Sequence, residues 1–124
     1  MIRVMLSCSA SGEFRHCEAS GHAGFAKRGK DIVCSAVTIV LKTALLLLSD
    51  LSSVNNDSIS LITETASRGN LNFSIAINDE AKDKLLNEVS IRLMCIADFI
   101  RSGITSVSKE YPDCVQLSEH RLDF

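Results

Sequence analysis

The chain has 124 residues, of which 46% are apolar and 23% charged, and its formal net charge at pH 7 is −2. These values are typical of a globular chain with one hydrophobic core, so we expect residues 1–124 to form a single domain. A net charge near zero gives no electrostatic footprint for nucleic acid, although Lys27, Arg28 and Lys30 form a small basic cluster. We therefore expect a protein partner and no direct contact with nucleic acid.

Cysteine usage indicates a reducing compartment. The five cysteines make an odd count, and the chain contains neither a CxxC nor an HExxH motif. Residues 1–6 alternate between apolar and polar types instead of forming the apolar core of a signal peptide. A metal site built from Cys17, His22 and Cys34 would match no familiar zinc pattern. We expect a cytoplasmic protein without disulfide bonds, metal or cofactor.

The first twenty residues predict a hairpin. Residues 1–9 alternate as a half-buried strand does, with Ile2, Val4, Leu6 and Cys8 on one face. Residues 10–13 form a turn, and residues 14–20 form a second strand. Strict alternation in that strand would put Phe14, His16 and Glu18 on one face, opposite Arg15, Cys17 and Ala19.

Residues 32–51 are almost wholly apolar and predict a long helix. About 20 apolar residues suffice to cross a bilayer, so a membrane-spanning segment is one interpretation. Lys42 lies near the middle of this segment, where a charge costs about 2.5–3.5 kcal/mol on insertion scales. A central helix buried on most sides is the better interpretation.

The rest of the chain repeats the pattern of two strands and a helix. Residues 58–63 and 71–77 predict strands joined by a turn at 67–70, in which Gly69 and Asn70 supply the positive backbone dihedrals that a tight hairpin needs. A second helix is expected from Asn78 or Asp79 to about Ser102, ended by Gly103. Residues 113–117 predict a last strand before a polar tail. The order ββαββαβ predicts an α+β fold in which both helices pack on one mixed or antiparallel sheet.

The residues between Gly21 and Cys34 carry the candidate chemistry. Asp31 is placed as the N-cap of the long helix, which would put Cys34 in the first turn, where unpaired amides and the helix dipole favour a thiolate. Gly24 and Gly29 would let the loop fold His22 back onto the sulfur. This layout is typical of a cysteine nucleophile with a histidine base.

Each of these residues also has a structural interpretation. On the residues alone, a buried apolar position is the commoner explanation for Cys34, and His22 is also compatible with a loop histidine. Asp31 caps the helix or orients His22. Lys27, Arg28 and Lys30 form a solvated loop or contact substrate from a mobile lid, and Phe25 either anchors that loop or covers the cleft.

The segment from Gly21-His22-Ala23 through Gly29-Lys30-Asp31-Ile32-Val33-Cys34-Ser35-Ala36 resembles the signature of the bacterial ribosomal-processing cysteine proteases. The resemblance implies a cysteine endopeptidase with Cys34 as nucleophile and His22 as base. It also implies that the substrate is a short N-terminal extension of a large-subunit ribosomal protein, and that the enzyme is a homodimer.

Two alternatives of other classes stay open at this stage. In a ribosome-associated binding module without enzymatic activity, the basic glycine-containing loop would contact its partner and Cys34 would be structural. A protein inserted in a membrane through residues 32–51 would require detergent, whereas we expect no membrane contact.

Overall fold

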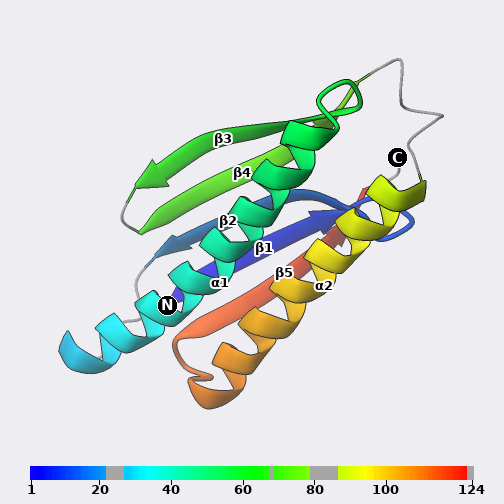
Figure 1. The fold of residues 1–124 in the computed structure, drawn as a ribbon. Coiled ribbons are helices and arrows are strands. Elements are labelled where there is room, and N and C mark those ends of the chain that lie inside the picture. The colour runs from blue at the N-terminus through cyan, green and yellow to red at the C-terminus, as the bar shows by residue number, and fades with distance from the viewer. Residues whose placement is uncertain (22–26, 68, 79–86, 123–124) are drawn as a thin grey trace.

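The computed structural model of the protein describes residues 1–21, 27–67, 69–78 and 87–122. Within these ranges the chain forms five strands and two helices in the predicted order ββαββαβ (Figure 1). The elements are β1 (Ile2–Cys8), β2 (Phe14–Gly21), α1 (Lys27–Val54), β3 (Ile59–Ser67), β4 (Asn70–Ile77), α2 (Asn87–Glu110) and β5 (Val115–Arg121). The predicted α+β class is confirmed.

The described strands form one mixed sheet in the order β3-β4-β2-β1-β5. β5 runs parallel to β1, whereas the other neighbouring pairs are antiparallel. α1 connects β2 to β3, α2 connects β4 to β5, and both helices cover the same face of the sheet (Figure 1). The prediction of one mixed or antiparallel sheet packed with two helices is therefore confirmed, and the parallel pair makes the sheet mixed.

The β1–β2 hairpin confirms one predicted alternation and corrects the other. In β1 the predicted core residues are all buried, but in β2 both Phe14 and Cys17 are fully buried despite their odd spacing. The cause is a bulge: His16 pairs with Ser7 while Phe14 pairs with Cys8, so the residue between them has no partner position. The bulge turns Phe14 onto the helix-covered face, where its ring stacks on Phe73 with centroids 5.7 Å apart.

α1 buries one face and exposes the other, so the prediction of burial on most sides is wrong. Only 28% of the apolar window within Ile32–Val54 is buried, although this segment is long and apolar enough to cross a membrane by length and composition. The buried residues recur at helical spacing and pack on the sheet and α2; they are Val33, Val37, Leu41, Ala44, Leu48 and Leu51.

Gly103 does not end α2, which continues to Glu110. A Cβ atom at Gly103 would lie 2.7 Å from Cγ1 of Val40 on α1. The glycine thus permits close packing of the two helices. The predicted start of this helix at Asn78 or Asp79 falls partly on residues outside the described ranges.

β5 extends four residues beyond its predicted end. Its pairing with β1 continues to the partners Cys8 and Arg121, and the amide of Leu122 donates to the carbonyl of Cys8 at 2.8 Å. Residues 116–121 are mostly polar because β5 forms the edge of the sheet and is largely exposed. Backbone pairing, rather than alternation of side chains, defines this strand.

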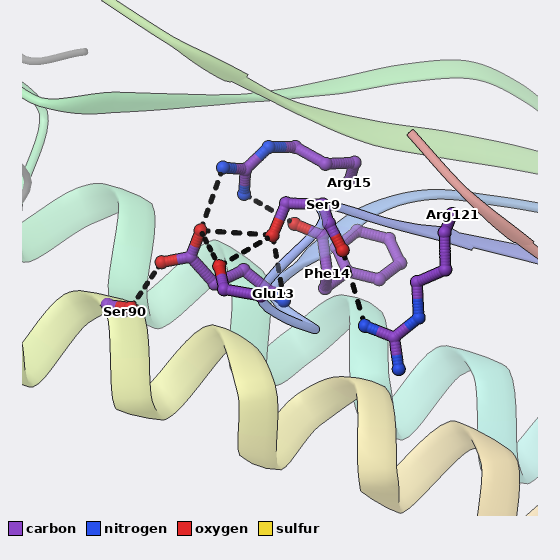
Figure 2. Close-up of polar contacts among 7 residues, drawn as sticks. Ser9, Glu13, Phe14, Arg15, Ser90 and Arg121 are labelled. Atoms are coloured by element: carbon purple, nitrogen blue, oxygen red, sulfur yellow. Dashed lines mark hydrogen bonds and ion pairs between the residues drawn. The ribbon is translucent and has the colours of Figure 1, made fainter. Parts of the chain in front are cut away.

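A buried carboxylate ties the β1–β2 turn to α2 (Figure 2). Oε1 of Glu13 accepts hydrogen bonds from Ser9 Oγ at 3.2 Å and from Arg15 Nη2 at 3.0 Å. Oε2 accepts a hydrogen bond from the hydroxyl of Ser90 on α2. Burial alone would raise the pKa of Glu13, but the bond from Ser90 and the charge of Arg15 together hold this pKa below its ordinary value.

Candidate active site

Gly21 ends β2 and sets the direction in which the chain leaves the sheet toward His22. Its φ is +101°, and its amide donates to the carbonyl of Gly69 at 3.1 Å in the β3–β4 turn. A Cβ atom at this position would collide with the carbonyl oxygen of Met1. Only glycine adopts this positive φ readily and also lacks the Cβ atom that would collide with Met1. His22 itself, together with Gly24 and Phe25, lies outside the described residues.

The start of α1 corrects the predicted position of the helix cap. The helix already includes Lys27, so Asp31 is its fifth residue and does not cap it. The basic residues of this segment favour helix, and the single glycine, Gly29, costs only about 1 kcal/mol. The backbone of Lys27, Arg28, Gly29 and Lys30 is therefore helical and does not form the predicted loop. A contact between Asp31 and His22 lies outside what the structure describes.

Cys34 is consequently the eighth residue of α1 instead of the third. In the interior of a helix the amide bonds to the carbonyl four residues earlier, so the Cys34 amide is not free to bind an oxyanion. The effect of the helix dipole also fades beyond the first turn. The prediction that the N-terminus of the helix activates Cys34 is therefore wrong.

The side of α1 that carries Cys34 faces the β3 half of the sheet. Eighteen residues make five full helical turns, so Cys34 and Ser52 lie on the same side of α1. Ser52 Oγ accepts the amide hydrogen of Leu61 on β3 at 3.2 Å. On another side of the helix, Val40 meets Gly103 of α2. Cys34 therefore lies on the side away from α2 and toward β3.

Exposure separates Cys34 from the three buried cysteines. Cys34 is half-buried, whereas Cys8, Cys17 and Cys114 are buried and Cys95 is exposed. Burial raises the pKa of Cys17 to about 12 and also raises that of Cys8, so both thiols stay protonated. Cys8, Cys17 and Cys114 thus belong to the core, whereas Cys95 on α2 does not.

The other two histidines, His16 and His120, lie on strands of the sheet and not in the connection that leads to Cys34. His16 lies on β2 with its Nε2 atom 2.6 Å from Oδ1 of Asn72 on β4, and His120 is exposed near the end of the edge strand β5. Among the described residues, no group of three or more His, Cys, Asp or Glu side chains is placed to hold a metal ion.

Gly69 has a φ of +81°, as predicted for the turn, whereas Asn70, like every other described non-glycine residue, has no positive φ. The place of Gly69 in the turn did not reveal that its carbonyl also accepts the bond from Gly21 that anchors the end of β2.

α1 thus carries a half-buried thiol, Cys34, and follows the connection whose sequence contains His22. Residues 1–116 match the family described as "Cysteine protease Prp". The chain belongs to this family, and the protein is a cysteine protease.

Solved structures share the fold. One is the essential ribosomal processing protease Prp of Staphylococcus aureus with a covalently linked product peptide, which has a TM-score of 0.69 and 19% identity over 96% of this chain and 99% of that chain. The same protease with a substrate peptide has a TM-score of 0.66, again at 19% identity and the same coverage. SMU.848 from Streptococcus mutans has a TM-score of 0.64 and 22% identity, covering 98% of this chain and 96% of that chain. No curated protein matches the chain.

Proposed function

We propose that Cys34 is the nucleophile of this protease and that His22 is its general base and acid. The observation that carries this assignment is the half-buried position of Cys34 on α1, on the side facing β3 and away from α2. The bond between Gly21 and Gly69 holds the end of β2 beside the β3–β4 turn, and His22 is the next residue along the chain. A connection of five residues, 22–26, separates β2 from α1.

In the proposed reaction His22 accepts the proton of the Cys34 thiol, and the sulfur attacks the carbonyl carbon of the scissile peptide bond. The carbon–nitrogen bond breaks when the protonated His22 gives its proton to the leaving amine. Water, deprotonated by His22, then attacks the thioester and releases the acyl product and the free thiol. The donors that hold the oxyanion come from groups other than the Cys34 amide, which is part of the helix interior.

The proposed substrate is the N-terminal extension of a large-subunit ribosomal protein. Support comes from the solved S. aureus protease, which is described as a ribosomal processing protease bound to substrate and product peptides. The family of the present chain is the same. We assign substrate contact to the segment that links His22 to Cys34, namely Gly24, Phe25, Lys27, Arg28, Gly29 and Lys30.

Of the two roles predicted for Asp31, capping the helix and orienting His22, the first is excluded because α1 begins at Lys27. We therefore propose that Asp31 orients His22. A carboxylate three residues before Cys34 would otherwise oppose formation of the thiolate through like-charge repulsion. We further propose that the enzyme works in the cytoplasm as a homodimer, without contact to nucleic acid or membrane.

The experiment is mass spectrometry of the ribosomal protein precursor from the same genome, incubated with the reduced enzyme. We expect the wild type to make a single cut near the N-terminus, and Cys34→Ala and His22→Ala to lower the cleavage rate by at least about 100-fold. Cys95→Ala is the matched control, because it removes an exposed thiol outside the proposed site. Cleavage retained by Cys34→Ala would contradict the assignment, and an intact precursor with the wild type would contradict the substrate.

A further inference from the structure

A cleft opens between α1 and α2 at the end of α1 that is remote from Cys34. The two helices run side by side on one face of the sheet (Figure 1), and they come closest where Gly103 makes room for Val40. Beyond this contact, between the last turns of α1 and the first turns of α2, lies a cavity of about 480 Å³. We call this cavity the interhelical cleft. Leu47, the first residue of α1 that lines it, is 13 residues beyond Cys34, or about 20 Å along the helix, so the cleft is separate from the candidate active site.

The interhelical cleft has an apolar floor and an open rim. Leu51 of α1 and Val89 and Ile96 of α2 line the cleft, and all three are buried in the core. At the rim, Leu47 and Val54 are 44% and 82% exposed. A ligand that enters from solvent would therefore cover apolar surface on both helices at once, which favours binding of an apolar body.

The charges around the interhelical cleft leave one carboxylate without compensation. Glu88 and Arg92, which both line it, form an ion pair of 3.2 Å. The cleft lies at the C-terminal end of α1 and the N-terminal end of α2, so the dipoles of the two helices bring opposite partial charges that cancel to a first approximation. Asp50 also lines the cleft and has no ion-pair partner among the described residues. The cleft therefore carries one net negative charge, which attracts a cation and repels an anion.

Size and charge together define the class of ligand. Small-molecule sites are typically cavities of about 300–1,000 Å³ with mostly apolar walls and a few polar groups that fix orientation. One uncompensated carboxylate matches one positive charge. A polycation would bring further charges close to the guanidinium of Arg92 and would place them against the apolar floor, where no group compensates them.

We propose that the interhelical cleft is a binding site for a small organic monocation with an apolar body, such as a protonated aliphatic amine. The apolar body lies against Leu51, Val89 and Ile96, and the cationic group lies at Asp50. This inference does not depend on the proposed catalytic residues or on the proposed substrate.

Protection of Cys95 from alkylation tests the site, because this thiol is exposed and lines the cleft. The full-length wild type is alkylated with iodoacetamide at pH 7 with increasing n-hexylamine, which is protonated at this pH. Hexanoate, with a similar apolar body and the opposite charge, and spermidine, a polycation, are the matched probes. We expect hexylamine to halve the alkylation rate of Cys95 at a concentration at least about tenfold lower than either probe requires. Alkylation of Cys34, which lies outside the cleft, controls for depletion of the reagent.

Two variants separate the charge of the cleft from its shape. Asp50→Asn keeps the size of the side chain and removes its charge, so the half-protecting concentration of hexylamine should rise at least about threefold. The preference for hexylamine over hexanoate should be lost in the same variant. Glu110→Gln removes an exposed carboxylate that does not line the cleft, and protection by hexylamine should be the same as in the wild type.

Four results would overturn the proposal. Hexylamine at millimolar concentrations could fail to protect Cys95, or hexanoate or spermidine could protect it equally well. The preference for hexylamine could also persist in Asp50→Asn, which would exclude Asp50 as the cation partner. Finally, Cys95 could be unreactive before any probe is added, since the cleft would then be covered by another chain.

Discussion

Two glycines show how a missing side chain determines where elements end and how closely they pack. Gly21 adopts a φ of +101° beside the carbonyl of Met1 and starts the connection to His22. Gly103 allows Val40 of α1 to approach the backbone of α2. The sequence does not distinguish a glycine that ends a helix from one that permits a packing contact, and for this reason the prediction that Gly103 ends α2 is wrong.

Replacing Gly103 with alanine tests the packing role. Alanine favours helix by about 1 kcal/mol, but its Cβ atom would lie 2.7 Å from Val40 Cγ1, and such overpacking costs about 1–3 kcal/mol. We expect a net loss in the free energy of unfolding, measured by urea titration, and recovery of stability in the double variant Gly103→Ala, Val40→Ala. The control Ser102→Ala, on the exposed side of α2, should stay within about 0.5 kcal/mol of the wild type. A stabilised Gly103→Ala protein would contradict the packing role.

At the scale of elements, the cores of helices and strands are predictable from periodicity, and their ends are not. The alternation of β1 and the helical spacing in α2 follow from the apolar side chains they bury. The bulge in β2 and the last residues of β5 depend on backbone pairing between strands, and the start of α1 is not marked by its apolar side chains. The shift of the α1 start from Asp31 to Lys27 changes the chemistry, because it moves Cys34 from the first turn into the helix interior.

The buried carboxylate of Glu13 joins the β1–β2 turn to α2, and we expect its contribution to the free energy of unfolding to depend on pH. Glu13 has a pKa below its ordinary value of 4.5 in the folded protein. Its stabilising contribution is therefore complete above the unfolded-state pKa and is lost as the pH falls through the lower folded-state value. We expect Glu13→Gln to lower the free energy of unfolding by about 1–3 kcal/mol at pH 7, and by less at pH 3.

Urea unfolding at pH 7, 5 and 3 measures this difference. Glu110→Gln is the control, because Glu110 is exposed at the end of α2 and its replacement should change stability little at any of these pH values. A destabilisation by Glu13→Gln that is equal at all three pH values would contradict an ionised Glu13 as the source of the effect.

For the whole molecule, the α+β class, the element order and the packing of both helices on a single sheet were predictable from the sequence. The order of strands was not, because residues 2–8 pair in parallel with residues 115–121 across almost the whole chain. The exposure of one face of α1 was not predictable either, since an almost continuous apolar run does not reveal which side of the helix is buried. Of the candidate site, Cys34 is half-buried on α1 and its role as nucleophile stays a prediction, whereas Asp31 does not cap the helix as predicted.

The measurement that tests the central claim most directly is the alkylation rate of Cys34 with iodoacetamide between pH 5 and 8, resolved by peptide mapping. Exposed Cys95 in the same molecule is the internal reference. If His22 takes the proton of Cys34, then Cys34 should react faster than Cys95 at pH 5–6 although it is more buried, and His22→Ala should abolish this advantage. A Cys34 that reacts no faster than Cys95 at any pH, or whose rate is unchanged by His22→Ala, would contradict the proposed pair of catalytic residues.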